Sequence, residues 1–364
     1  MRTIFDSVCI GNLECKNRIL RSATWEALAD EEGFMSEKQY EIYEELAKNE
    51  IGLISTGYAR IMKEDCPNAG MMGIYDDCFI PSYQKLTDCV HQHGGKIMMQ
   101  IAYGGTKTTY KVGERQIFAP SDIPEKSTGT QGHAMDLEDI SALVLAHAQA
   151  ARRVKESGFD AVQIHAGHNY LLNQFLSPYY NNRKDQYGGS FENRSRLILE
   201  CYDAIREMVG KDYPILIKLT CCDFSEDGFR FEECRKLCAM LTERGIDAIE
   251  VSGNIHGKAE KMIGQEFDEH VITKNGYFVE YAKIIAEDQR IPIFVTGGYR
   301  DRKEMEDWLN SSQIAGFGMS RPLLSEPDLV SRWKQGDDKK ARCVHCSKCR
   351  TPEGNYCTIF ERKE

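Results

Sequence analysis

The 364-residue sequence lacks any apolar run long enough to cross a membrane, and its N-terminus lacks the apolar core of a signal peptide. It also lacks an excess of basic residues, because its formal net charge is -10 and its isoelectric point is near 5.5. Without such an excess, a broad phosphate-rich surface is a poor partner. We therefore expect a cytoplasmic protein that binds neither membranes nor nucleic acid.

The sequence also has no G-x-G-x-x-G motif after a strand, so a dinucleotide-binding half of the usual kind is not expected. Its length exceeds that of most single domains, but α/β barrels commonly run from 200 to over 400 residues. We predict one large domain over residues 1–335 and a short Cys-rich extension over residues 336–364.

What the sequence does contain is a regular alternation of short apolar runs and longer helix-like segments. The nearly continuous apolar character of the runs is typical of strands buried on both faces of a parallel sheet. Helices are predicted at 137–158 and 232–245, both ending in glycine, and Ser36 is predicted to cap another. The eight runs are 18–25, 51–59, 96–104, 160–167, 214–222, 247–253, 291–298 and 314–321.

Eight strand-then-helix units predict a (β/α)8 TIM barrel, with a doubly wound open sheet as the alternative. Chemistry in such barrels sits where strands end and loops begin. His165 and His168 follow the fourth strand and therefore lie at that face. The residues alone leave open a hydrogen-bonding pair and a buried structural role, whereas two histidines are too few to complete a metal site.

The stretch from 165 to 194, HAGHNYLLNQFLSPYYNNRKDQYGGSFENR, resembles the signature of the Old Yellow Enzyme family of flavin-dependent ene-reductases. Gly167 and Asn169 replace residues that are usual in the family. The resemblance continues through residues 16–24, 97–105, 119–121, 295–301 and 318–329. The matching positions are His165, His168, Tyr170, Leu171, Gln174, Phe175, Leu176, Ser177, Pro178, Asn182, Arg183, Asp185, Tyr187, Gly188, Gly189, Ser190, Glu192, Asn193 and Arg194.

The resemblance implies a barrel that binds FMN and takes hydride from NAD(P)H onto the flavin N5. The hydride then passes to the activated C=C of an α,β-unsaturated carbonyl or carboxylate compound. His165 and His168 would grip the substrate oxygen, where negative charge develops. Tyr170 would donate a proton to the α-carbon, because a phenol stays protonated at neutral pH.

The same resemblance assigns residues to FMN at several strand ends. Gln100 would bond the pyrimidine edge, since an amide offers a donor and an acceptor. Lys218 would lie near N1 and O2 and stabilise the reduced flavin. A purely structural role for Lys218 would require a carboxylate partner that the sequence does not reveal, so this role is the less favoured one. The other assigned residues are Ser22, Ala23 and Thr24 beside the ring and Gly297, Gly298, Ser320 and Arg321 around the phosphate.

Two positions depart from the family and are predicted to contact the substrate. Trp25 stands where relatives place Thr or Cys, and Tyr103 stands where many have His. An indole at position 25 would narrow the pocket or stack on a substrate ring, and the sequence does not choose between these. The flavin site itself is not affected by either change.

Fourteen cysteines are many for a protein of this kind. Ten are scattered, and Cys9, Cys201, Cys234 and Cys238 are among those expected to be buried and reduced. The other four, Cys343, Cys346, Cys349 and Cys357, resemble the [4Fe–4S] motif of the dienoyl-CoA reductase and trimethylamine dehydrogenase branch, with a shorter last loop. A zinc site or an empty thiol group are the alternatives. A cluster would need a separate electron-donor protein, because no second flavin domain follows in this sequence.

The functional prediction is therefore an NAD(P)H-dependent flavin oxidoreductase acting on a small molecule with an activated alkene. A dienoyl- or amine-type dehydrogenase with a [4Fe–4S] relay is the alternative within the family. The alternative from another class of enzyme is a flavin-free, metal-dependent barrel lyase or hydrolase with His165 and His168 as metal ligands. The sequence leaves open the alkene, the choice between NADH and NADPH, and the oligomeric state.

Overall fold

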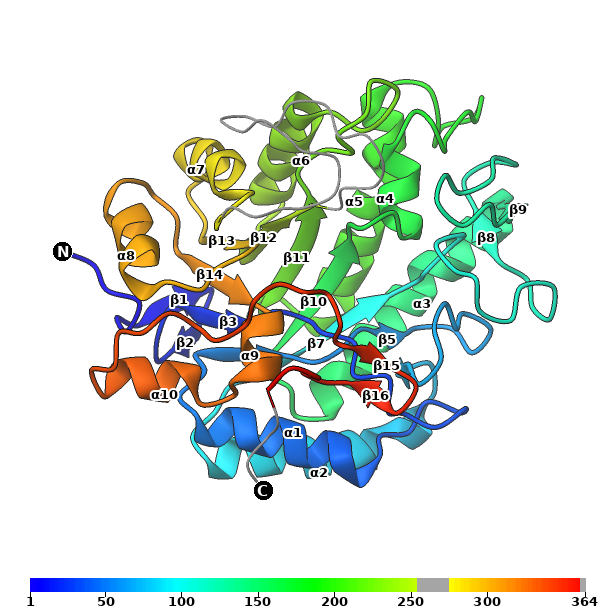
Figure 1. Cartoon of the computed structure of the whole chain (residues 1–364). Coiled ribbons are helices and arrows are strands. Elements are labelled where there is room, and N and C mark those ends of the chain that lie inside the picture. The colour runs from blue at the N-terminus through cyan, green and yellow to red at the C-terminus, as the bar shows by residue number, and fades with distance from the viewer. Residues whose placement is uncertain (254–274, 361–364) are drawn as a thin grey trace.

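The computed structural model describes residues 1–253 and 275–360 and contains a closed barrel of eight parallel strands (Figure 1). The ring closes because β7 pairs with β10, placing Gln100 opposite Gln163. This closure confirms the predicted TIM barrel and shows that the open-sheet alternative is wrong. In ring order the strands are β3 (Ile19–Arg21), β4 (Leu53–Ser55), β7 (Ile97–Ala102), β10 (Ala161–Ala166), β11 (Ile215–Thr220), β12 (Ala248–Ser252), β13 (Ile293–Thr296) and β14 (Gly316–Met319).

Each of the eight predicted runs contains one barrel strand, and every residue of β7, β10 and β11 is buried. Helices outside the barrel cover the other face of these strands, which explains the apolar runs. The helices are α1 (Glu37–Lys48), α2 (Ile80–Gln92), α3 (Leu137–Glu156), α4 (Leu171–Leu176), α5 (Phe191–Val209), α6 (Phe231–Glu243), α7 (Val279–Asp288), α8 (Arg302–Asn310), α9 (Arg321–Ser325) and α10 (Leu329–Lys334), with a short 3-10 turn at Asp77–Phe79.

The predicted helix ends are confirmed. Ser36 is the N-cap of α1, and the Gln39 side chain accepts a hydrogen bond from its backbone N–H at 3.1 Å. Helices α3 and α6 are followed by Gly158 and Gly245, whose φ angles of 84° and 85° lie in the left-handed region. Glycine adopts this conformation without steric cost, so it ends each helix and returns the chain to the barrel.

The inside of the barrel is arranged in layers because inward side chains recur every second residue along a strand. An apolar layer fills the end where the strands begin, and a hairpin of β1 (Val8–Ile10) and β2 (Leu13–Cys15) packs against it. Two residues further along, the inward side chains become polar. The apolar layer contains Leu20, Leu53, Met98, Ala161, Leu216, Ala248 and Phe294, and the polar layer contains Ser22, Ser55, Gln100, Gln163, Lys218, Glu250 and Thr296.

The chain beyond α10 returns across the barrel and ends in a small hairpin of β15 (Arg350–Thr351) and β16 (Gly354–Asn355), drawn red in Figure 1. The backbone N–H of Asn355 donates to the Glu26 carbonyl at 2.8 Å, which attaches the hairpin to the loop after β3. We retain residue 336 as the proposed start of the extension. Its last residues, 361–364, lie outside the described part.

Short elements β5 (Ala59–Arg60), β6 (Met72–Gly73), β8 (Phe118–Ala119) and β9 (His133–Ala134) lie in the loops between strands and helices. In the described part of the chain, no helix is both long and apolar enough to span a membrane.

All fourteen cysteines are free, and Cys201, Cys234 and Cys238 are buried as predicted. The prediction for Cys9 is wrong, because this residue occupies the outward position of β1 and is exposed.

Candidate active site

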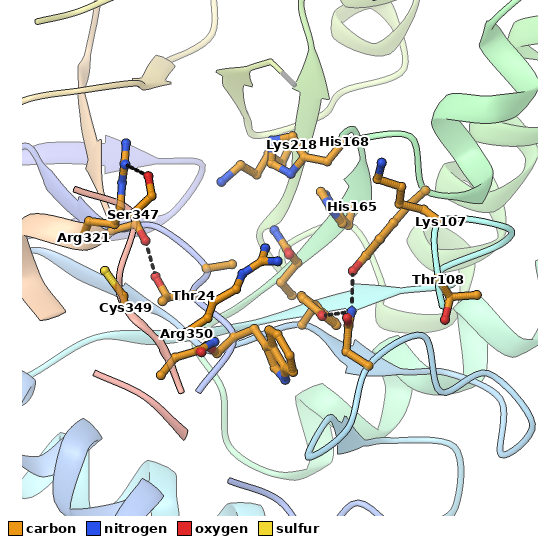
Figure 2. Close-up of a pocket in the computed structure, with 18 of the residues that line it drawn as sticks. Thr24, Lys107, Thr108, His165, His168, Lys218, Arg321, Ser347, Cys349 and Arg350 are labelled. Atoms are coloured by element: carbon orange, nitrogen blue, oxygen red, sulfur yellow. Dashed lines mark hydrogen bonds between the residues drawn. The ribbon is translucent and has the colours of Figure 1, made fainter. Parts of the chain in front are cut away.

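A cavity of about 790 Å³ lies where the barrel strands end (Figure 2). It joins many of the predicted site residues: Ala23, Thr24, Trp25, Gln100, His165, His168, Tyr170, Lys218, Ser320, Arg321 and Cys349. Predicted residues that do not line it are Ser22, Tyr103, Gly297, Gly298, Cys343, Cys346 and Cys357. Other lining residues, which the sequence did not indicate, include Tyr58, Asn68, Lys107, Thr108, Ser347, Arg350 and Asn355.

His165, His168 and Tyr170 form a compact group at the end of β10. The His165 ring centroid lies 5.0 Å from that of His168 and 5.0 Å from that of Tyr170. The chain reverses tightly here, because His168 and Asn169 both have positive φ, at 59° and 60°. His168 is held from two sides: its N–H donates to the Thr220 hydroxyl at 2.8 Å, and its Nε2 lies 2.9 Å from the Ser252 hydroxyl.

The His165 imidazole is neutral at neutral pH. Burial lowers its pKa well below the ordinary value, and the charges of His168 and Lys218 lower it further. Its Nδ1 is buried and has no hydrogen-bond partner among the described residues. A buried polar atom without a partner is costly, and the residue that carries it lines the cavity.

The Tyr170 phenol stays protonated. Burial raises its pKa to about 12, against the opposing effect of a hydrogen bond with Tyr58. Asn68 Nδ2 donates to the Tyr170 hydroxyl at 3.3 Å and to the Tyr58 hydroxyl at 2.6 Å. Sequence reasoning missed Tyr58 and Asn68, since both belong to loops after β4 without a motif.

The floor of the cavity is a buried hydrogen-bonded network centred on Glu250 of β12. The Gln100 amide donates to Gln163 Oε1 at 2.7 Å, and the Gln163 amide donates to Glu250 Oε2 at 2.7 Å. The Ser22 and Thr296 hydroxyls both donate to Glu250 Oε1. Side chains from β10, β13 and the end of β3 thus converge on one carboxylate, which sequence reasoning missed because these contacts join residues far apart in the chain.

Lys218 completes this network and corrects one premise of the sequence prediction. Its Nζ lies 3.1 Å from Glu250 Oε1 and donates to the Ser22 hydroxyl at 2.6 Å. The carboxylate partner that a structural role requires is therefore present. Burial alone would raise the Glu250 pKa, but the Lys218 ammonium and the donating side chains hold it below its ordinary value. The pair is thus ionised, and Lys218 still borders the cavity.

The ends of the first and eighth strands meet at one side of the cavity. The Thr24 and Ser320 hydroxyls are 2.7 Å apart, and Arg321 Nη1 donates to the Ser347 hydroxyl at 3.3 Å (Figure 2). Gly297 does end β13 as predicted, but it faces aromatic rings: a Cβ added there would lie 2.9 Å from the Tyr277 ring. The assignment of Gly297 and Gly298 to a phosphate remains a prediction.

The two predicted substrate residues lie in different places. Trp25 lines the cavity, and its indole N–H donates to the Ala69 carbonyl at 3.1 Å. Tyr103 is buried away from the cavity wall and stacks on Phe118 with ring centroids 5.6 Å apart. Of the two, Trp25 alone reaches the space that a substrate would occupy.

The four terminal cysteines lie within fifteen residues of the extension. Burial raises the pKa of the Cys343 and Cys349 thiols, and both also feel the charges of Cys346 and Cys357. Within residues 1–253 and 275–360, the group whose ligand atoms lie within 4.8 Å of one another is Glu44, Cys89 and His93 rather than the terminal thiols. Four neighbouring thiols fit an iron–sulfur cluster by donor type, and the wall of the cavity includes Cys349.

The donors around the cavity fit FMN. Gln100 presents an amide, Lys218 a buried ammonium, and Ser320 with Arg321 a hydroxyl and a guanidinium suited to a phosphate. His165, whose Nδ1 has no partner among the described residues, lines the same cavity. The fold and the site thus define the class of flavin-dependent oxidoreductases.

The comparisons with known proteins lead to the family. The sequence model of the NADH:flavin oxidoreductase / NADH oxidase family matches residues 3–340. The NADH oxidase of Thermoanaerobacter brockii is 31% identical over 347 residues, covering 94% of this chain and 52% of that protein. The N,N-dimethylglycine/sarcosine dehydrogenase of Chromohalobacter salexigens is 30% identical over 359 residues, covering 95% of this chain and 50% of that protein. The chain spans about half the length of these curated relatives.

Solved structures agree. A 2-naphthoyl-CoA reductase in complex with 2-naphthoyl-CoA superposes with a TM-score of 0.84 and 25% identity, covering 93% of this chain and 53% of that one. Morphinone reductase in complex with tetrahydroNAD gives a TM-score of 0.76 and 25% identity, covering 92% and 91%. The chain therefore belongs to the NADH:flavin oxidoreductase / NADH oxidase family, and the resemblance to Old Yellow Enzyme is confirmed.

Glu250→Gln should destabilise the protein strongly, because Lys218 would remain buried without a counter-charge. We expect the free energy of unfolding to fall by about 3–5 kcal/mol in a urea titration. The double variant Glu250→Gln/Lys218→Met should recover most of that loss. Glu37→Gln, which breaks the exposed pair with Lys85, is the matched control and should change little. Equal stability of Glu250→Gln and wild type would contradict the role of the network.

Proposed function

We propose that the protein reduces the activated C=C bond of an α,β-unsaturated carbonyl or carboxylate compound with electrons from NAD(P)H, in a ping-pong cycle through FMN. The observation that carries the proposal is the grouping of His165, His168 and Tyr170 in one cavity with Gln100 and Lys218. When bound, FMN supplies the hydride transfer. The chain's own residues supply binding, orientation and the proton.

Gln100, Lys218, Ser320 and Arg321 would hold the flavin. Lys218 lines the floor of the cavity and its partner Glu250 does not, so the positive end of this ion pair faces the cavity. A fixed cation of this kind favours a more negatively charged cofactor and so raises its reduction potential. Ala23 and Thr24 would border the ring from the first strand.

His165 and His168 would bind the oxygen that conjugates with the alkene. A neutral imidazole donates one N–H, and the low pKa of His165 keeps it neutral. Donors fixed before the reaction stabilise charge on that oxygen without reorganisation. The hydrogen bonds of His168 to Thr220 and Ser252 supply this rigidity.

Tyr170 would deliver the proton to the α-carbon. Its pKa of about 12 keeps the phenol protonated across the neutral range. The amide of Asn68 and the phenol of Tyr58 stand beside it and stabilise the phenolate left after transfer. The rate of alkene reduction should therefore not decrease near neutral pH through deprotonation of Tyr170.

A second candidate is a dienoyl- or amine-type dehydrogenase that exchanges electrons through a [4Fe–4S] cluster. It is favoured by the four neighbouring thiols, by Cys349 at the cavity wall, and by a relative described as an N,N-dimethylglycine/sarcosine dehydrogenase. Cys343, Cys346, Cys349 and Cys357 would hold the cluster. A separate electron-donor protein would then be a partner, and an oligomer is compatible with either candidate.

The flavin-free metal enzyme is set aside, because the family match defines a flavin oxidoreductase. A cytoplasmic location is supported by the cysteines, all of which are free in the structure.

Tyr170→Phe tests the proton-donor role. Reduction of the enzyme by NAD(P)H should be unchanged, whereas alkene reduction should slow by about 10²–10⁴-fold in single-turnover stopped-flow measurements. Tyr179→Phe removes a hydroxyl from the segment after α4, outside the cavity, and is the matched control. Unchanged rates in both half-reactions of the Tyr170 variant would contradict this role.

Iron and zinc analysis of anaerobically purified protein tests the second candidate. A cluster predicts about four irons per chain and their loss in a Cys346→Ser variant. Zinc at one per chain would indicate a structural site, and a metal-free protein with full activity would remove the relay from the mechanism.

A further inference from the structure

The cavity wall carries a strong excess of positive charge. In the described part of the chain, no aspartate or glutamate lines the cavity, although Glu250 and Glu125 lie just behind its wall. Such a surface selects anions over cations and neutral molecules. The lining cations are Lys107, Lys218, Arg321 and Arg350.

Two of these cations already have a carboxylate partner within the protein. Lys218 pairs with Glu250 at 3.1 Å, and Lys107 pairs with Glu125 at 3.2 Å. Arg321 lies with Ser320 at the end of the eighth strand, where the proposed function places the flavin phosphate. The fourth charge, on Arg350, is left for another ligand.

Arg350 belongs to the extension rather than to the barrel and reaches from β15 toward the middle of the cavity (Figure 2). Its guanidinium carbon lies 5.9 Å from the centroid of the Trp25 ring, a cation–π contact. Within residues 1–253 and 275–360 it has no carboxylate within ion-pair distance. It is therefore a positioned guanidinium without a counter-charge.

The local structure fixes the backbone of Arg350, whose side chain is exposed. Arg350 pairs with Asn355 across the hairpin, and the Asn355 side chain donates to the Trp25 carbonyl at 2.5 Å. The Trp25 indole is held in turn by the Ala69 carbonyl. The backbone of Arg350 and its cation–π partner Trp25 are thus connected through Asn355. This connection lowers the conformational entropy that the hairpin loses when Arg350 binds a ligand.

Arg350 also faces the reacting groups. Burial raises the pKa of Tyr170 and of Tyr58, and the positive charge of Arg350 acts in the opposite direction on both phenols. Arg350, Tyr58 and Tyr170 also line the same cavity. An anion bound to Arg350 would therefore lie in the cavity that Tyr170 lines.

We propose that Arg350 binds a carboxylate group of the substrate and makes the enzyme selective for anionic alkenes over neutral ones. A guanidinium donates strong, charge-assisted hydrogen bonds to carboxylate oxygens, and its cation–π contact with Trp25 places it at the cavity wall. The reaction assigned to the substrate rests on the proposed function, but the carboxylate site can be tested without turnover.

The experiment compares cinnamate with cinnamamide, which have the same skeleton and differ in charge. One oxygen of the cinnamate carboxylate would accept from His165 and His168, and the other from Arg350. Both are titrated into the oxidised FMN-loaded enzyme, and binding is followed by the flavin absorbance. In Arg350→Gln the Kd of cinnamate should rise about tenfold or more, while that of cinnamamide stays within about twofold of wild type. Arg350→Lys should be intermediate, because it keeps the charge and loses the planar fork.

Arg342→Gln is the matched control, since it removes an exposed arginine from the same extension outside the cavity. It should bind cinnamate as wild type does. The FMN content of each variant reports whether the barrel is intact. The KM for NAD(P)H should be unaffected by Arg350→Gln.

Equal weakening of cinnamate and cinnamamide in Arg350→Gln would overturn the proposal, as would unchanged cinnamate binding. Weaker NAD(P)H binding with normal cinnamate binding would assign Arg350 to the nicotinamide nucleotide and also overturn it. Failure of the proposed function is a separate outcome: an enzyme that reduces no alkene yet binds cinnamate through Arg350 would retain this site.

Discussion

The ion pair between Lys218 and Glu250 is the interaction on which the rest of the site depends. Two charges inside a barrel are tolerated only because each has a partner and further hydrogen bonds. Glu250 accepts from Ser22, Gln163 and Thr296 and so connects residues of different strands. The ion pair and these hydrogen bonds therefore hold charged groups in fixed positions at the floor of the cavity.

This floor follows from the two-residue period of the strands. Side chains two positions apart point to the same side, so an apolar plug at Met98 and Leu216 leads directly to Gln100 and Lys218 above it. His165 comes two residues after Gln163 and lies higher still. The barrel therefore separates stability at its closed end from chemistry at its open end, as such folds generally do.

Sequence reasoning found what local patterns encode. The eight strands were predictable because burial on both faces leaves apolar runs, and the family motif marked His165 and Tyr170. Glu250 and Asn68 could not be found in this way, since their partners are distant in the chain. Lys218 was noticed, but its partner was not. For the extension, sequence reasoning considered only the cysteines, whereas the folded chain also places Arg350 of the extension at the cavity wall.

The most direct test of this account is the midpoint potential of the bound FMN. Lys218→Met combined with Glu250→Gln removes the cation and leaves no buried charge unpaired. If the ion pair exists to place a positive charge beneath the flavin, the potential of this double variant will be clearly lower than that of wild type. An unchanged potential, in a variant that still binds FMN, would contradict the account.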